Sequence, residues 1–220
     1  MTHRQALEEA PAPRSSATLL PWRAAVAPEP APVNLVAAEA AAADLLAALG
    51  QPVDSDGMIE TPRRMVRAYA EMLTPGSFEF TSFANVEGYD ELVLVEDIPV
   101  RSVCEHHMLP FVGVAHLGYL PADRILGLSK FARLVDFYSH RGQTQERLTQ
   151  QIAEHLERHL APRGVGVVIE AEHTCMSLRG VRAAGARTVT SALLGTLRTD
   201  PSSRAEFLAL AHSRRQACRT

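Results

Sequence analysis

Cysteine is scarce in this chain, which argues against one class of protein. There are 3 cysteines in 220 residues, too few for the disulfide frameworks that hold small secreted domains together. No run of about eighteen apolar residues occurs, so we expect no membrane partner and no membrane-spanning helix. The first residues lack the apolar segment that follows a basic start in secretory signals. We therefore expect a cytoplasmic protein.

The chain also lacks a large excess of charge of either sign. Its formal net charge is −3, too close to neutrality to favour nucleic acid through bulk electrostatics, so we expect no nucleic-acid partner. Lysine is nearly absent, because Lys130 is the single lysine among 22 basic residues. Either codon bias explains the arginines and chance the lysine, or a compact ammonium group is needed at this position.

The composition changes along the chain. Residues 1–33 hold six of the 14 prolines and little periodicity, which is typical of a disordered tail. A basic tail is predicted at residues 214–220. With 46% apolar residues over its whole length, the chain can bury one good core between these tails.

Hydrophobic periodicity predicts both helices and strands between the two tails. Asn34, Thr61 and Ser129 are predicted N-caps, Pro62 a first helical residue and Gly50 a stop. Helices are predicted at residues 34–50, 56–73, 127–140, 142–162 and 201–215. Strands are predicted at residues 92–104 with a break at Pro99, 111–121, 165–175, and before residue 197. Residues 121–126 are predicted to form a tight turn and a short strand before Gly127. Residues 76–90 are predicted to form a loop.

One stretch, RSVCEHHMLPF at residues 101–111, is typical of a metal site. Cys104 and His107 are spaced C-x-x-H, so a thiolate and an imidazole can bind the same ion from a strand end or a tight turn. Two ligands do not hold zinc, and the best candidate for a third is Cys175, which follows an alternating apolar run. If that run is a strand, His173 and Cys175 point to the same side.

Three such ligands leave one position of a tetrahedral zinc ion open, as in catalytic rather than structural sites. A water molecule there ionises at a pKa of about 7, and His106 and His173 are the neighbouring proton carriers. This pattern favours a hydrolytic site. In the alternative interpretation, the spacing arises by chance and the cysteines are small buried hydrophobic residues.

Two predicted helix starts carry groups suited to a nucleotide. Ser129, Lys130 and Arg133 can bind an anion such as phosphate, unless this is an ordinary capped helix with two solvated cations. Gln145 and Glu146 lie in the first turn of the next helix, where an amide beside a carboxylate can pair with a base edge. Alternatively, Glu146 only complements the helix dipole.

Other polar residues are interpreted as surface groups. Arg63, Arg64 and Arg67 fall off the apolar stripe of their predicted helix. His155 and His159 are four residues apart but do not match the H-E-x-x-H pattern of metalloproteases. We expect all five side chains to face solvent.

The segments CEHHMLPF, GLSKFARLV, RGQTQERLT and AEHTCMSLRG, in this order and at these separations, resemble the motifs of GTP cyclohydrolase I. The resemblance covers about residues 34–212. It implies an α+β tunnelling fold (T-fold), in which antiparallel strands with packed helices from several subunits form an oligomeric β-barrel. The implied domain spans residues 34–213, with N-terminal helices at 34–75 and a T-fold core at 90–213. The implied assembly is a homodecamer with active sites at subunit interfaces.

The resemblance also implies a role for each candidate residue. The implied cofactor is Zn²⁺, and the substrate is GTP. The implied metal ligands are Cys104, His107 and Cys175, and the implied proton-transfer residues are His106 and His173. The implied substrate contacts are Gln145 and Glu146 for guanine, and Ser129, Lys130, Arg133, Arg179 and a neighbouring subunit's Arg64 for the triphosphate.

The implied reaction converts GTP and water to 7,8-dihydroneopterin triphosphate and formate, the first step of tetrahydrofolate and pterin biosynthesis. Hydroxide adds to C8 of guanine while His173 protonates N7, and a second hydrolysis releases formate. His106, with Ser129, assists ribose opening and the rearrangement that follows.

The sequence also has two rival interpretations. A T-fold relative such as the nitrile reductase that makes a queuosine precursor uses a nucleophilic cysteine and NADPH, and the intact Cys104, His107 and Cys175 set argues against it. A purely structural zinc in an oligomeric scaffold is disfavoured by two additional histidines beside the ion and by the anion-binding helix.

Overall fold

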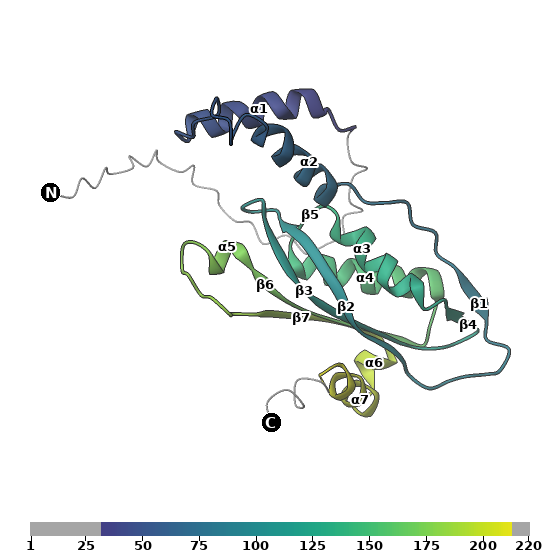
Figure 1. The fold of residues 1–220 in the computed structure, drawn as a ribbon. Helices are drawn as coiled ribbons and strands as arrows, with labels where there is room; N and C mark the ends of the chain where they lie inside the picture. The colour runs from purple at the N-terminus through teal and green to yellow at the C-terminus, as the bar shows by residue number, and fades with distance from the viewer. Residues whose placement is uncertain (1–31, 213–220) are drawn as a thin grey trace, which may run out of the picture.

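Five strands make the main sheet, in the order β5-β2-β3-β6-β7 (Figure 1). All neighbours are antiparallel except β5, which runs parallel to β2. The computed structural model describes residues 32–212, so the tails predicted at 1–33 and 214–220 lie outside the described residues, apart from residues 32 and 33. The strands of this sheet are β2 (Val93–Cys104), β3 (Leu109–Leu120), β5 (Gly142–Gln143), β6 (Gly164–His173) and β7 (Thr188–Gly195).

Two helices cover one face of the sheet and enclose the main core. They are α3 (Ser129–Ser139) and α4 (Gln145–Leu160). The helix predicted at residues 142–162 is confirmed, and each of its four leucine and isoleucine positions is at most 2% exposed. These residues are Leu148, Ile152, Leu156 and Leu160. They pack against alternate residues of β3 and β6, as one-sided burial of a sheet requires.

The opposite face is covered at one end by α6 (Thr196–Thr199) and α7 (Pro201–Ala211). Phe207 of α7 is fully buried and lies over Gly118 and Gly166, where a Cβ atom on Gly166 would come within 2.7 Å of the ring. Two glycines in adjacent strands thus make room for one aromatic ring. Leu210 of the same helix is 43% exposed, because it lies away from the sheet-facing side of α7.

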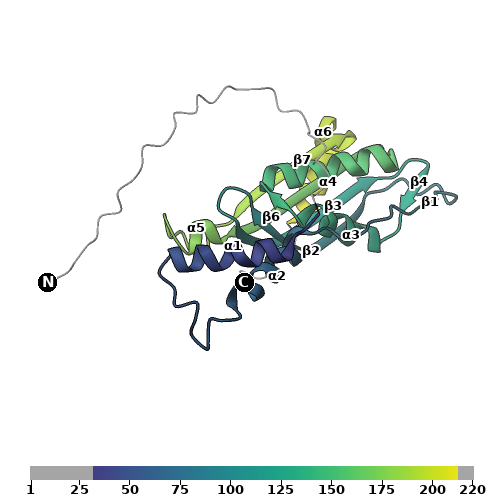
Figure 2. The same cartoon turned by 90° about the horizontal axis from the view of Figure 1, so that it is seen from above.

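The N-terminal helices α1 (Leu35–Ala48) and α2 (Thr61–Leu73) pack against each other. Viewed from above, α1 and α5 (Thr174–Ser177) lie toward one end of the sheet, and β1 (Ser82–Ala84) and β4 (Arg124–Leu126) lie at the other (Figure 2). Asn34 caps α1 as predicted, accepting a hydrogen bond from the Ala37 amide at 3.0 Å. Gly50, with φ +74°, follows the end of this helix.

Some predicted boundaries are wrong. Thr61 and Ser129 are first helical residues rather than N-caps, and neither α2 nor α3 has a side-chain cap. The break in β2 lies between Val95 and Ile98 rather than at Pro99, which stays paired with β3. Proline is tolerated there because β5 pairs with β2 only near its end, so the proline lies on an open edge.

Two further predictions need correction. The predicted loop at residues 76–90 contains β1, which pairs with β4. His155 is not a surface residue but is half-buried, with its ring 5.6 Å from Phe78 and 5.3 Å from Phe80, whereas His159 is exposed as predicted. Between residues 32 and 212, no helix is both long and apolar enough to cross a membrane.

Candidate metal centre and active site

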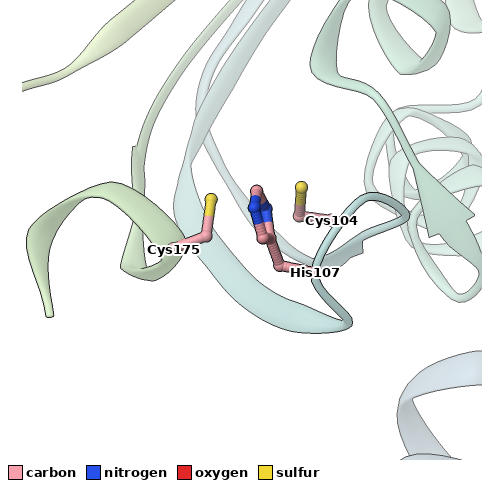
Figure 3. Close-up of side chains that lie close together, drawn as sticks. All are labelled: Cys104, His107 and Cys175. Atoms are coloured by element: carbon pink, nitrogen blue, oxygen red, sulfur yellow. The ribbon is translucent and has the colours of Figure 1, made fainter. Parts of the chain in front are cut away.

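Three side chains from separate elements meet at one end of the sheet (Figure 3). Cys104 ends β2, His107 lies in the following turn and Cys175 lies in α5. Their ligand atoms all lie within 4.8 Å of one another, and both cysteines are free. Two thiols and an imidazole are a donor set that suits zinc and leaves one tetrahedral position for water or substrate. The chemistry of the residues therefore fits the ion that the sequence predicts.

The turn at residues 105–108 places Cys104 and His107 on the same side. It closes with a hydrogen bond of 2.8 Å from the Met108 amide to the Cys104 carbonyl, and Met108 takes a φ of +53°. The Glu105 amide donates to the Gln143 carbonyl at 3.0 Å, which ties the turn to β5. The C-x-x-H spacing is thus held by backbone bonds from both sides.

Cys175 reaches the site in a different way from the predicted one. The strand ends at His173, and Cys175 lies in the single turn of α5, so the two side chains do not share the face of one strand. The Thr174 hydroxyl donates to the Pro110 carbonyl at 2.6 Å and anchors this turn on β3. Burial and the neighbouring Cys104 thiol raise the pKa of the Cys175 thiol. Without a cation the thiol therefore keeps its proton, and metal binding displaces it.

His173 is held by contacts on two sides. Its ring stacks on Phe111, with centroids 4.6 Å apart and planes at 12°, and its Nε2 atom lies 2.8 Å from Oε1 of Gln145. Burial lowers the pKa of His173 below its usual value, and the carboxylate of Glu146 partly opposes this. The imidazole is therefore neutral at pH 7 and oriented before any substrate enters.

Gln145 determines which nitrogen of His173 carries the proton. Its side chain is 1% exposed, and its amide nitrogen donates to the carbonyls of Ile169 and Thr188, both at 3.0 Å. Because the amide nitrogen faces those carbonyls, Oε1 must face His173 as an acceptor. Nε2 of His173 is therefore the protonated nitrogen in the neutral ring.

A cavity of about 270 Å³ joins these groups. It brings together both cysteines, all three histidines of the predicted site and both residues at the start of α4. The lining residues that carry chemistry are Cys104, His106, His107, Gln145, Glu146, His173 and Cys175. A larger groove of about 730 Å³ between α1 and α2 holds no carboxylate, imidazole or thiol, so the chemistry belongs to the smaller cavity.

Comparison with known proteins identifies the family of this chain. Residues 38–212 match the family described as GTP cyclohydrolase I. The chain belongs to the GTP cyclohydrolase I family. It is 54% identical over 180 residues to GTP cyclohydrolase 1 of Mycobacterium tuberculosis (strain ATCC 25618 / H37Rv), covering 79% of this chain and 88% of that protein. GTP cyclohydrolase 1 of Streptomyces griseus is 54% identical over 184 residues, covering 80% of this chain and 90% of that protein.

Among solved structures, the archaeosine synthase QueF-Like in the apo form gives a weak likeness. Its TM-score is 0.40 at 21% identity, over 47% of this chain and 93% of that chain. The assignment to the GTP cyclohydrolase I family depends on the sequence relatives.

Several predicted substrate residues of this GTP cyclohydrolase I family member do not line the cavity. All are described by the structure, and all except the half-buried Lys130 are exposed. They are Arg64, Ser129, Lys130, Arg133 and Arg179. Arg179 acts electrostatically on the Cys175 thiol, so it lies near the metal centre. Arg64 belongs to α2, and the other three belong to α3.

Sequence reasoning missed Phe111 and Arg147 in this GTP cyclohydrolase I family member. Phe111 is the register partner of His173 across β3 and β6, and strand register cannot be read from either strand alone. Arg147 lies in the quoted RGQTQERLT segment, where an arginine in the first turn of a helix opposes the helix dipole. This unfavourable placement of a cation was the sequence feature that could have indicated a special role for Arg147.

Proposed function

We propose that this chain uses Zn²⁺ to convert GTP and water to 7,8-dihydroneopterin triphosphate and formate, the first step of tetrahydrofolate and pterin biosynthesis. The observation that supports this most is the convergence of Cys104, His107 and Cys175 in a cavity that also holds His106 and His173. We place the reaction in the cytoplasm, with no nucleic-acid or membrane partner.

The proposed metal ligands are Cys104, His107 and Cys175. These residues would hold Zn²⁺, which would supply a Lewis acid that makes water nucleophilic near pH 7. His106, whose Nδ1 atom lies 3.8 Å from the Cys104 sulfur, is close enough to move protons during ribose opening and rearrangement.

His173 is the proposed acid that protonates N7 of guanine as C8 is attacked. A lowered pKa makes the protonated imidazole a stronger acid, and the stacked Phe111 ring and Gln145 hold it in one orientation. Proton delivery to N7 neutralises the charge that develops as the ring C–N bond breaks. Because the resting ring is neutral and its Nε2 proton is bonded to Gln145, Nδ1 takes up the proton that the attacking water loses and passes it to N7. Gln145 positions the ring for both transfers.

Glu146 is the proposed reader of the guanine edge. A carboxylate can accept from both N1–H and the 2-amino group of guanine, a pairing that adenine does not offer. Gln145 was also predicted to bind guanine, but the protein already occupies both ends of its side-chain amide. We therefore assign guanine selectivity to Glu146, and any contact of Gln145 with the base to its backbone.

The triphosphate is the proposed ligand of the cationic residues outside the cavity. Arg179 acts from the same chain, near Cys175. Ser129, Lys130 and Arg133 on α3, and Arg64 on α2, do not line the same chain's cavity, so we propose that they act on the sites of neighbouring copies. This requires a homo-oligomer, and the proposed assembly is the T-fold decamer with its barrel of strands and its sites at subunit interfaces.

The activity is tested with purified protein and GTP. We expect formate and a fluorescent pterin to appear together, and both to stop when a chelator removes the metal. Formate production that a chelator does not stop would contradict the metal's role. The absence of both products would contradict the proposed reaction.

The shared site is tested by mixing two inactive variants, Cys175→Ser and Lys130→Met, after dissociation and reassembly. If one chain supplies the metal and another the phosphate contacts, random mixing restores about one quarter of the sites. Activity that stays at zero would place both halves in one chain.

A further inference from the structure

Arg147 joins the start of α4 to the metal-binding turn. Its Nε atom donates to Oε1 of Gln143 at 2.9 Å, and its Nη2 atom donates to the Gly142 carbonyl at 3.1 Å. The same Nη2 atom forms an ion pair with the carboxylate of Glu105. One planar guanidinium group thus contacts β5 and the turn together, which an ammonium group cannot reproduce.

Glu105 is the residue between the metal ligand Cys104 and the proposed proton carrier His106. All four residues of the turn are exposed, so packing does little to hold it. Its far end is fixed by the hydroxyl of Tyr69, which donates to the Met108 carbonyl at 2.9 Å. The end next to Cys104 is fixed by the Glu105 amide bond to β5 and by the ion pair with Arg147.

The β5 residue that contacts Arg147 is held in place by its own hydrogen bonds. Gln143 is fully buried, and its amide nitrogen donates to the Tyr138 carbonyl and to Oε1 of Gln151, both at 2.9 Å. Its Oε1 atom is thereby aimed at Arg147. A buried and fully bonded glutamine therefore sets the position of the guanidinium, and the guanidinium sets the position of Glu105.

We propose that Arg147 is a positioning residue that acts through Glu105, holding the turn with Cys104 and His107 in register with Gln145 and Glu146 at the start of α4. The kinetic part of this inference depends on the proposed function, but the metal-binding part does not. Arg147 does not serve as a phosphate ligand, because Glu105 balances its charge and its Nε and Nη2 hydrogens point to protein acceptors.

The test compares Arg147→Met, Arg147→Lys, Glu105→Gln and the double variant Arg147→Met/Glu105→Gln. Arg158→Met is the matched control, because Arg158 is an exposed arginine on the same helix. Metal binding is followed with Co²⁺ alone, through the thiolate-to-cobalt absorption band. Turnover is followed with GTP in the zinc-loaded protein.

We expect Arg147→Met to weaken Co²⁺ binding about tenfold or more, as loss of groups that orient metal ligands does. Because His106 and His107 then lose their placement, kcat falls about 10- to 100-fold while KM for GTP changes less than about twofold. Glu105→Gln has a similar effect, the double variant is no worse than Arg147→Met alone, and Arg147→Lys recovers only part of the loss. Arg158→Met behaves like the unmodified protein.

Three results would overturn the inference. A raised KM with unchanged kcat would make Arg147 a substrate ligand. A lowered melting temperature with normal Co²⁺ binding and normal kcat would make the ion pair merely stabilising. Additive effects in the double variant would show that Arg147 does not act through Glu105. If the unmodified protein makes no formate, the proposed function fails, and the Co²⁺ titrations still decide the role of Arg147.

Discussion

The Nε2 atom of His173 lies 2.8 Å from Oε1 of Gln145, whose amide nitrogen donates to the carbonyls of Ile169 and Thr188. A buried glutamine at the start of α4, bonded to carbonyls of β6 and β7, thus fixes the tautomer of the proposed catalytic acid. This relationship separates two roles for Gln145, as a support for His173 or as a direct contact with guanine.

Replacing Gln145 by methionine should lower kcat about 100-fold, because His173 loses the acceptor that orients it. The same change should destabilise the protein by about 2–3 kcal/mol, because two strand carbonyls lose a donor. Steady-state kinetics and thermal melting measure the two effects. Combining Gln145→Met with His173→Ala should add little to the kinetic loss. A raised KM for GTP with intact kcat would favour direct base contact instead.

Cys175→Ser should remove the metal and abolish turnover, because a serine hydroxyl is a poor zinc ligand. Metal per chain, measured by atomic emission after dialysis, should fall close to zero. His173→Ala is the matched comparison, since it should stop turnover while the metal stays bound. Full activity in metal-free Cys175→Ser protein would refute the ligand assignment.

Lys130→Arg should raise KM for GTP about tenfold with little change in kcat, because a planar guanidinium does not replace a compact ammonium at a fitted phosphate site. The control is Arg198→Lys, which exchanges the same two residue types at an exposed position on α6 and should leave KM unchanged. An unaltered KM in Lys130→Arg would mean that the single lysine of this chain is accidental.

Gly113→Ala should destabilise the sheet by about 3 kcal/mol or more, because this change overpacks a closed strand pair. The new Cβ atom would lie 1.9 Å from the Glu170 carbonyl oxygen and 2.6 Å from the Ala171 Cα atom. Gly76→Ala is the control, since nothing lies within 4 Å of its Cβ position. Denaturant unfolding measures both, and equal midpoints would contradict the close approach of β3 and β6.

His155 should make the folded state acid-sensitive. Burial, followed by the charges of His159 and Arg158, lowers the pKa of His155 from 6.5 to about 4. Between about pH 6.5 and 4, His155 is therefore protonated in the unfolded chain but neutral in the folded protein. The free energy of unfolding therefore decreases as the pH falls through that range. The loss should be about 1 kcal/mol, because solvent still reaches the ring.

The His155→Gln variant isolates this effect, because its amide can still bond the Tyr138 hydroxyl, which lies 3.0 Å from Nδ1 of His155. Its melting temperature should fall less between pH 6.5 and 4.5 than that of the unmodified protein. Identical pH slopes in the two proteins would exclude His155 as the source.

Local periodicity predicted most helices and strands correctly. In α4, leucine and isoleucine recur at helical spacing, and the structure buries them as expected. The failures lie where distant segments meet. The strand β1 forms only because β4 is beside it, and Pro99 remains in β2 only because that part of the strand has an open edge. Neither condition is visible in the residues concerned.

The sequence by itself identified the donor set of the candidate metal centre, because the C-x-x-H spacing and the scarcity of cysteine left Cys104, His107 and Cys175 as the candidates. Only the tertiary structure decided how Cys175 arrives, from a one-turn helix anchored on Pro110 rather than from a strand. It also decided that Gln145 faces inward to His173. Residue type and short spacing set which atoms can bind an ion or a proton, whereas the packing of strands distant in sequence sets which of those atoms meet.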